Sequence, residues 1–327
     1  MVSLNRTSRY TLLLLACFWW LPYTLFIGHG SSIEGDPIID HIADGHVLHF
    51  GAIGCPLPVI LYRPGKGFSC FSSSQLFDPT GAPLVYQGVV ASGHKIIALD
   101  GQLIYDLSVT KNVAMMWLSL LLLLLFFIAL SHYYQSRPKL KGVAFLPLSL
   151  VRFIRDRVVI PQLGRKNGVR FTSYFLTLFC YILINNILGF LPGGANVTGN
   201  VSVVLVLSGA TFLLTLLNGS PAYWHHIFAP PGVPKLIYPI IVPIELMGLL
   251  IKPFTLTIRL CCNMLAGHLM LLHIIGLIFV FDTIFASFLV VPFAAALILL
   301  KLFSAVMQAY IFTLLSAMAL GKAIRGH

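Results

Sequence analysis

Two stretches near the C-terminal end of the chain are apolar for longer than a lipid bilayer is thick. They cover residues 239–281 and 284–320, and Asp282 marks the turn between them. As continuous helices they would be roughly 64 and 55 Å long at a rise of about 1.5 Å per residue, whereas the hydrocarbon core of a bilayer is about 30 Å thick. Upright helices of that length do not fit. Both segments must therefore tilt strongly or bend, and four prolines offer places to bend: Pro239, Pro243, Pro253 and Pro292.

The composition of the whole chain is that of a membrane protein. Of its 327 residues, 58% are hydrophobic and only 9% are charged, and the mean hydropathy is +0.91. Three more apolar spans, at 113–130, 171–192 and 201–217, bring the expected number of membrane-spanning helices to five. The sequence thus predicts an all-α polytopic membrane protein. The net charge of +11 could indicate nucleic-acid binding, but no aromatic-interleaved basic surface or nucleic-acid motif is present, so no nucleic-acid partner is expected.

The charges are distributed unevenly along the chain, and this predicts its orientation. Residues 133–170 contain nine Lys or Arg and one acid, Asp156, so the positive-inside rule places this loop in the cytoplasm. Seven of the ten acids lie between residues 32 and 111, which are therefore expected outside the cytoplasm. The C-terminal KAIRGH is basic and is expected in the cytoplasm. The loop contains an alternation of apolar and basic turns that predicts an amphipathic helix at about 137–167 on the cytoplasmic surface.

The N-terminal third predicts an exported module. Residues 1–30 have the pattern of an export signal, with Arg6 and Arg9 before an apolar run, and act either as a cleaved signal peptide or as an anchor. Residues 31–111 contain the short β-rich pieces PLPVILY, PLVYQGVV and HKIIALDGQLIYDLSV between Gly, Pro and Ser, which predict a small strand-and-loop module. A disulfide between Cys55 and Cys70 is permitted in that compartment, and two free thiols are the alternative. Four histidines of this region match no metal-ligand spacing, so no metal is expected: His41, His46, His49 and His94.

Three charges recur at seven-residue intervals inside the first long apolar stretch. Glu245, Lys252 and Arg259 share one face of a helix, because seven residues drift by only about 20°. A charge at the centre of a bilayer costs roughly 2.5 to 3.5 kcal/mol on insertion scales, so such groups usually face a wet path or a partner. Asn263 lies one turn beyond Arg259 on nearly the same side, whereas His268 points to roughly the opposite side.

Further polar residues lie in the neighbouring spans. Lys301 and Gln308, seven residues apart, share a face of the last helix. Two polar stripes on consecutive long helices indicate a common partner or conduit. Asn185 and Asn186 lie inside the span 171–192, where they either form hydrogen bonds between helices or line a path for water.

The chain lacks the motifs of bond-making chemistry. No catalytic triad, Walker loop, zinc pattern or dinucleotide fingerprint is present, so the sequence predicts no enzyme activity and no cofactor. The movement of ions remains. An arginine cannot itself release protons, but it can hold an approaching carboxylate in the ionised form.

Several of these segments resemble a known family. KPFTLTIRLCCNMLAGH, preceded by PIELMG and followed by LKLFSAVMQAYIFTLLSAMAL, is similar to subunit a of F-type ATP synthases, and NNILGFLPGGANVTGNVSV fits it too. The likeness covers residues 112–322, in the bacterial form with an extended, exported N-terminal region. It implies the static half of a rotary motor in the bacterial inner membrane. The implied partners are a ring of c subunits, b-type peripheral stalk subunits and the rest of the F0F1 complex, and the implied ion is H⁺.

The resemblance also implies roles for single residues. Arg259 would be the essential arginine that faces the ring, with Asn263 and Gln308 flanking it. The remaining polar residues would line two aqueous half-channels: an inlet with Asn186, His268 and Lys301, and an outlet with Glu245 and Lys252.

The sequence departs from the family at two inlet positions. Family members commonly carry Glu or His at the position of Lys301 and an acid at that of Gly189, so this inlet is poorer in acids than usual. Two interpretations of Lys301 remain open, a lysine that relays protons with His268 and one that only seals or packs.

Three other functions are compatible with buried charges. A secondary transporter or proton antiporter would use them for its substrate, although no internal repeat is evident. In a scaffold protein the charges would pair with each other inside the chain. A sodium-translocating form of the same subunit would share the arginine, but no clear cage of oxygen ligands for sodium is present in the sequence.

Overall fold

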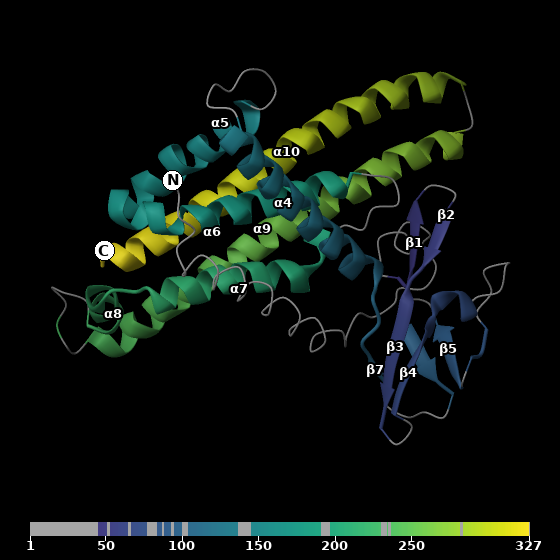
Figure 1. Ribbon diagram of the computed structural model, residues 1–327, viewed down its shortest axis with the longest axis horizontal. Coiled ribbons are helices and arrows are strands. Elements are labelled where there is room, and N and C mark those ends of the chain that lie inside the picture. Colours follow the sequence, from purple (N-terminus) through teal and green to yellow (C-terminus); the bar gives the residue numbers. More distant parts are fainter. Residues whose placement is uncertain are drawn as a thin grey trace.

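The computed structural model contains a helical bundle and a small β-module (Figure 1). It describes residues 45–50, 53–64, 67–76, 84–86, 88–92, 95–99, 104–136, 145–190, 197–229, 234, 237–281 and 284–326. The proposed signal at 1–30 lies outside the described residues.

Four described helices are long and apolar enough to cross a membrane. A fifth span results if the α7–α8 pair, bent by 101°, counts as one. The prediction of a mostly helical polytopic protein with a small β-containing N-terminal region is confirmed. The helices are α4 (Lys111–Ser136), α5 (Phe145–Phe153), α6 (Ile160–Leu188), α7 (Val201–Leu217), α8 (Pro221–Phe228), α9 (Tyr238–Phe281) and α10 (Ile284–Arg325), with a π-helical segment η2 (Ile154–Val159) and short 3₁₀ turns at Ser73–Gln75 (η1) and Val197–Gly199 (η3).

The two long apolar stretches form a hairpin of continuous helices. α9 and α10 run antiparallel along the length of the bundle (Figure 1). Pro243 and Pro253 lie inside α9 and Pro292 lies inside α10, and none of them ends a helix. α10 continues five residues past the expected end at 320, to Arg325. The hairpin is supported by α6, which packs on α10, and by α7, which packs on both α9 and α10.

The expected surface helix and the following span are joined by a sharp bend. Gly164 has φ 77° and ψ 167°, a conformation that favours glycine, and the chain folds back there so closely that a Cβ on Gly168 would lie 3.3 Å from the Ile160 Cα. Before the bend, Ile154, Val158 and Leu163 are buried. Arg152, Arg155 and Arg157 are exposed on the other side of this segment, which is the pattern of an amphipathic helix. Residues 137–144 of the predicted helix lie outside the described residues.

Hydroxyl groups cross-link the helices of the bundle. The Tyr174 hydroxyl on α6 lies 2.9 Å from the Thr211 hydroxyl on α7, and Ser208 of α7 lies 2.6 Å from Thr257 of α9. All four residues are buried. Because lipid supplies no hydrophobic driving force between helices, such contacts contribute to how the helices recognise one another in a membrane.

The described residues of the β-module form three small antiparallel sheets. The strands β1 (Val47–Phe50) and β2 (Ile53–Pro56) form one hairpin, and β5 (Val89–Ser92) and β6 (Lys95–Ala98) form another. The third sheet has the order β4-β3-β7, from Gly67–Ser72, Pro58–Arg63 and Tyr105–Asp106. Its core contains Val59, Leu61, Phe71, Leu76, Val89 and Ile96. The sequence predicted strands at β3, β5, β6 and β7 and missed β1, β2 and β4.

The thiols and histidines of the module form neither a bridge nor a metal site in the described part of the chain. Cys55 and Cys70 are free and exposed. No group of three or more His, Cys, Asp or Glu within the described residues could hold a metal ion. His46 instead pairs with Asp106, at 3.3 Å from Nε2 to Oδ2.

The Asp106 carboxylate makes the module sensitive to acid. Burial would raise the pKa of Asp106, but its contacts with His46 and with the Ser108 amide, at 2.9 Å, hold the pKa below its usual range. A carboxylate whose pKa is lowered in the folded state stabilises the fold at pH values above its unfolded pKa. This stabilisation is lost as the pH falls through the folded pKa. Asp106→Asn should therefore destabilise the module by about 1 kcal/mol at neutral pH and by progressively less below about pH 4.

Hydrogen exchange at the β3–β7 pair, corrected for intrinsic exchange rates, measures this difference. Asp156→Asn is the matched control, because Asp156 pairs with Arg155 on an exposed surface far along the chain. If the stability difference between Asp106→Asn and the wild type is the same at neutral and at acid pH, the lowered pKa of Asp106 is wrong.

Candidate functional site: a polar stripe and two cavities along α9

The three charges of α9 lie between its buried side and its outer face. Glu245, Lys252 and Arg259 are all exposed, whereas Leu256 and Leu260, which flank the stripe on one side, are buried against the bundle. Among the described residues, none forms a hydrogen bond or an ion pair with Arg259. On the other side of the stripe the outer face is apolar, with Ile251, Phe254 and Ile258 exposed by 51%, 58% and 45%. The Arg259 guanidinium thus lies at the edge of an exposed apolar helix face, without a partner in the described part of the chain.

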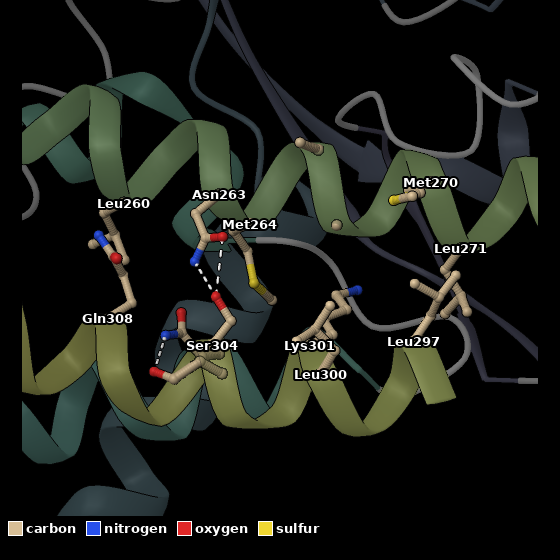
Figure 2. Close-up of a pocket in the computed structure, with 14 residues that line it drawn as sticks. Leu260, Asn263, Met264, Met270, Leu271, Leu297, Leu300, Lys301, Ser304 and Gln308 are labelled. Atoms are coloured by element: carbon tan, nitrogen blue, oxygen red, sulfur yellow. Dashed lines mark hydrogen bonds between the residues drawn. The ribbon is translucent and has the colours of Figure 1, made fainter. Parts of the chain in front are cut away.

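A cavity of about 260 Å³ lies between α9, α10 and the end of α6. We call it the Lys301 cavity. Four of the residues singled out by the sequence line it together: Asn186, Asn263, Lys301 and Gln308. Figure 2 shows Lys301, Ser304 and Gln308 following one another along the side of α10 that faces α9. His268 belongs to α9, but its side chain lies outside those that the structure describes, so its place in the inlet remains a prediction.

Asn186 both joins helices and lines the cavity. Its Nδ2 donates to the carbonyl of Ala305 on α10 at 3.1 Å, and its Oδ1 accepts from the Thr198 hydroxyl at 2.9 Å. The side chain is 1% exposed. The interpretation of an inter-helix hydrogen bond therefore holds for Asn186, and the lining of a path for water remains a prediction. Asn185 turns away from this site and donates to the Tyr181 carbonyl of its own helix at 2.9 Å.

Asn263 and Gln308, the two residues predicted to flank Arg259, differ in whether their amides form hydrogen bonds. Asn263 Nδ2 donates to the Ser304 hydroxyl at 2.7 Å, and the same hydroxyl lies 3.1 Å from Asn263 Oδ1, which ties α9 to α10 (Figure 2). Gln308 is only 6% exposed, and within the described residues its amide forms no hydrogen bond. A buried amide at a cavity is a natural site for ordered water.

Lys301 is held by an aromatic ring and by a glycine. Its Nζ lies 4.8 Å from the centre of the Phe190 ring, within the range of a cation–π interaction. Its methylene chain passes Gly267, where a Cβ would lie 3.5 Å from the lysine Cγ and Cε. The ammonium group is therefore placed at the cavity by contacts from α6 and α9.

A second, smaller cavity of about 30 Å³ lies between α7, α8, α9 and α10. We call it the Lys252 cavity. Hydroxyl groups dominate its polar lining, with Ser208, Thr211, Thr215, Tyr223 and Ser316 beside Lys252. Ser316 is fully buried, and its Oγ has no hydrogen-bond partner among the described residues. Glu245 lines neither cavity but lies within electrostatic range of Tyr223, which lines this one.

The two cavities lie at different levels of the α9–α10 hairpin. The Lys252 cavity uses residues of α9 up to Leu256, and the Lys301 cavity uses residues from Leu260 onward. On α10 the Lys301 cavity uses residues up to Gln308, and the Lys252 cavity uses residues from Ser316 onward. Arg259 therefore occupies the level between them, on the outer face of the same helix.

The Met264 methyl group occupies the space beside Gly189, the position at which the resemblance implies an acid. A Cβ on Gly189 would lie 2.6 Å from that methyl group. Met264 also lines the Lys301 cavity. A side chain at position 189 would therefore require the end of the flexible methionine to move.

Several residues of these sites could not be found from the sequence. The Thr198 hydroxyl bonds to Asn186, the Ser304 hydroxyl bonds to Asn263, and the Phe190 ring contacts Lys301. Thr198, Ser304 and Phe190 are ordinary residues for a membrane helix or its connection. The hydroxyl lining of the Lys252 cavity was missed in the same way. Only the packing of α7 against α9 and α10 brings these hydroxyls together.

Comparison with known proteins decides the family. A family model described as ATP synthase A chain matches residues 113–320. The chain belongs to the ATP synthase A chain family. A second model, described as Domain of unknown function (DUF8433), matches residues 37–113, which include the β-module.

Relatives from three bacteria are similar over most of the chain. ATP synthase subunit a of Myxococcus xanthus (strain DK1622) is 41% identical over 241 residues, which are 70% of this chain and 77% of that protein. Subunit a of Anaeromyxobacter sp. (strain Fw109-5) is 34% identical over 312 residues, covering 92% and 73%. Subunit a of Chlorobium phaeobacteroides (strain BS1) is 36% identical over 312 residues, covering 92% and 80%.

Proposed function

We propose that this chain is the proton-translocating stator subunit a of an F-type ATP synthase, a non-catalytic subunit of the F0 sector in a bacterial inner membrane. It provides two aqueous half-channels beside a ring of c subunits, and Arg259 couples the flow of protons to the rotation of that ring. One observation carries this proposal: an exposed Arg259, without a partner among the described residues, lies at the level between two separate cavities that each have polar side chains in their lining.

The mechanism follows from the cost of charge in lipid. A ring carboxylate can face hydrocarbon only when it is protonated, because an ionised carboxylate there is very costly. It can pass Arg259 only when it is ionised, since the guanidinium stabilises the charged form. A proton delivered from one side therefore travels around the ring before it is released on the other. Arg259 prevents it from taking the short path between the two cavities.

The two cavities supply the entry and the exit. The Lys301 cavity, with Asn186, Lys301 and the nearby His268, is the inlet from the extracytoplasmic side. The Lys252 cavity, with Glu245 near its Tyr223, is the outlet to the cytoplasm. Asn263 and Gln308 flank Arg259 at the inner end of the inlet. The basic residues of 133–170 and the basic C-terminus support this orientation.

The exposed apolar face of α9 is the surface for the ring. Ile251, Phe254 and Ile258 are exposed on that face, Arg259 lies at its edge, and the guanidinium has no partner among the residues that the structure describes. The b-type peripheral stalk and the remaining F0F1 subunits complete the complex. Several protons are needed for each ATP made, since one charge moved through 100 mV is worth about 2.3 kcal/mol.

Photocross-linking tests the ring surface. A benzophenone amino acid in place of Phe254 should cross-link to the ring protein when the whole complex is illuminated in its membrane, because Phe254 is 58% exposed on the outer face that Arg259 borders. Trp117 on α4 is the matched control, since it is 54% exposed on a helix that packs on α6. We expect no ring adduct from that position. Equal yields of ring adduct from both positions, or none from Phe254, would contradict the proposal.

A further inference from the structure

The central sheet of the β-module, with the strand order β4-β3-β7, is apolar on both faces. Its inner face carries Val59, Leu61 and Phe71, which are buried. Because successive side chains of a strand point to opposite faces, the residues that alternate with these lie on the outer face. None of the six outer residues in the two rows farthest from α4 is charged: Tyr62, Phe68 and Tyr105 in one row, and Ile60, Cys70 and Leu107 in the other. We call this surface the aromatic face.

The three rings of the aromatic face form a row across the three strands. Tyr62 lies opposite both Phe68 and Tyr105 in the strand register, and its ring centre lies 4.8 Å and 6.2 Å from theirs. Phe68 is 74% exposed and Tyr105 is 58% exposed. An antiparallel sheet with one solvated face commonly carries polar residues on that face. A row of exposed rings in their place indicates an interaction surface.

The sheet is joined to α4 with almost no slack. The Val109 amide still donates to the Pro58 carbonyl of β3 at 3.2 Å, and α4 begins two residues later, at Lys111. The Lys111 amide in turn donates at 2.9 Å to the carbonyl of Gly45, which precedes β1. α4 is one of the helices that are apolar enough to cross a membrane. The sheet therefore starts at the membrane surface, and Figure 1 shows that β7 does not continue the axis of α4.

Of the two faces of this sheet, the inner one is already covered. Val89 of β5 and Ile96 of β6 belong to the core on that side. The aromatic face is the one left to meet a surface next to α4. Its two rows are about 7 Å apart, because they are two residues of about 3.3 Å apart along each strand. A sheet that lies along the membrane can therefore keep both rows at the level of the headgroups.

The open edge of β4 sets the depth at which the face can lie. Ile60 directs its backbone toward β7, because its carbonyl accepts from the Leu107 amide at 2.9 Å and its amide donates to Ser108 Oγ at 3.1 Å. Cys70 lies opposite Ile60 on β4, so its own N–H and C=O point to the open edge of the ladder. Hydrocarbon does not tolerate an open sheet edge. The headgroup layer supplies water for these groups, and it is the layer in which tyrosine is enriched.

We propose that the aromatic face lies flat on the membrane surface at which α4 begins, with its three rings at the level of the lipid headgroups. The partner is the lipid surface itself. Because none of the six residues is charged, the contact does not depend on anionic lipids. The inference goes beyond the proposed function and does not depend on Arg259. It gives the β-module a role of its own, as an anchor on the membrane surface beside the bundle.

Two native thiols of the module allow a matched test. Cys70 lies on the aromatic face, and Cys55 of β2 is an exposed thiol outside it. Each test protein retains one of these two, and both carry Cys17→Ser and Cys262→Ser. A bimane fluorophore is attached to the retained thiol, and the whole complex is placed in phosphatidylcholine vesicles that contain a lipid with a nitroxide on its headgroup. The nitroxide lipid should quench the bimane at Cys70 and not that at Cys55, and added phosphatidylglycerol should not change the quenching.

The reaction of the unlabelled thiols with a charged, membrane-impermeant maleimide measures how firmly the face is held. Cys70 should react at least about tenfold more slowly than Cys55, the factor that the burial of one Phe side chain supplies. Phe68→Ser should raise the Cys70 rate by about tenfold and abolish its quenching by the nitroxide lipid, whereas Phe68→Trp should preserve both. Leu99→Ser is the matched control, since Leu99 is 61% exposed outside the aromatic face, and it should leave Cys70 unchanged. An unchanged Cys55 rate in every variant shows that the module remains folded.

Three results would overturn the proposal. The first is equal quenching or equal reaction rates at the two thiols. The second is a slow Cys70 that the nitroxide lipid does not quench, because a second copy of the chain or a neighbouring subunit would then cover the face in place of lipid. The third is a Phe68→Ser variant whose Cys70 keeps the slow rate and the quenching, since the rings would then not hold the face on the membrane.

Discussion

Replacing Arg259 by alanine should abolish coupled transport while the complex still assembles. The guanidinium is exposed, and no described residue of this chain depends on it for a hydrogen bond or an ion pair, so its loss removes no internal contact. It does remove the one fixed charge between the two cavities. We expect both ATP synthesis and ATP-driven proton pumping to fall by at least about a hundredfold, the range for removal of a single preorganised electrostatic group.

A passive leak distinguishes this effect from simple inactivation. Without the arginine, an ionised or protonated ring carboxylate can move directly between the cavities, so the membrane should conduct protons without turnover of ATP. The leak is measured in vesicles that contain the complete complex and are energised by an imposed membrane potential. Arg259→Lys keeps a positive charge but lacks the planar fork of donors, and we expect intermediate coupling from it.

A surface arginine provides the matched control. Arg165 is exposed next to the bend at Gly164, far along the chain from both cavities. Arg165→Ala should retain wild-type synthesis. If Arg259→Ala complexes of normal composition make ATP at the wild-type rate, the proposed mechanism is wrong.

Periodicity explains why the long hairpin and its polar stripe could be predicted from sequence. Charges are conspicuous in apolar segments, and a spacing of seven residues fixes their common face whatever the tertiary structure. The exposure of Glu245, Lys252 and Arg259 on the outside of α9 agrees with that prediction. α7 begins and ends at the residues expected, 201 and 217, because an asparagine cap and a polar turn bound its apolar run.

The remaining features depend on contacts that periodicity does not encode. β4 has the sequence GFSCFS, in which no clear alternation marks a strand, and its pairing with β3 decides its structure. The Lys252 cavity is lined by Ser and Thr residues that also bond to carbonyls of their own helices, as Thr215 does to Thr211 at 2.8 Å. A hydroxyl that is satisfied within its own helix gives no sign in the sequence of which neighbour it will face.

Packing around two positions could not be predicted from the sequence. The lack of an acid at Gly189 and the lysine at 301 are visible in the sequence, but their surroundings are not. Met264 lies against the first and Gly267 against the second, so two residues of α9 that are three positions apart contact both.

The C-terminal end of α10 should be the part of the bundle most sensitive to a single added methyl group. A Cβ on Gly321 would collide with the backbone carbonyl oxygen of Gln162, and it would lie 3.0 Å from the carbon of the same carbonyl. That backbone stands just before the bend at Gly164 and cannot yield as a flexible side chain would. Arg325 Nη2 donates to the same Gln162 oxygen at 2.7 Å, so one displacement would weaken two contacts between α10 and α6.

We therefore expect Gly321→Ala to destabilise the protein by about 1–3 kcal/mol, the usual cost of overpacking a close contact. Gly209→Ala is the matched control, because Gly209 also lies inside a helix and nothing approaches its Cβ position within 4 Å. That substitution should be neutral or stabilise by up to about 1 kcal/mol. Thermal loss of helicity in detergent, followed by circular dichroism, compares the two variants with the wild type. Equal stabilities of the two variants would show that α10 does not pack on the Gln162 backbone. Ser316 of the Lys252 cavity lies five residues before Gly321, so that cavity would then lack the support of this contact.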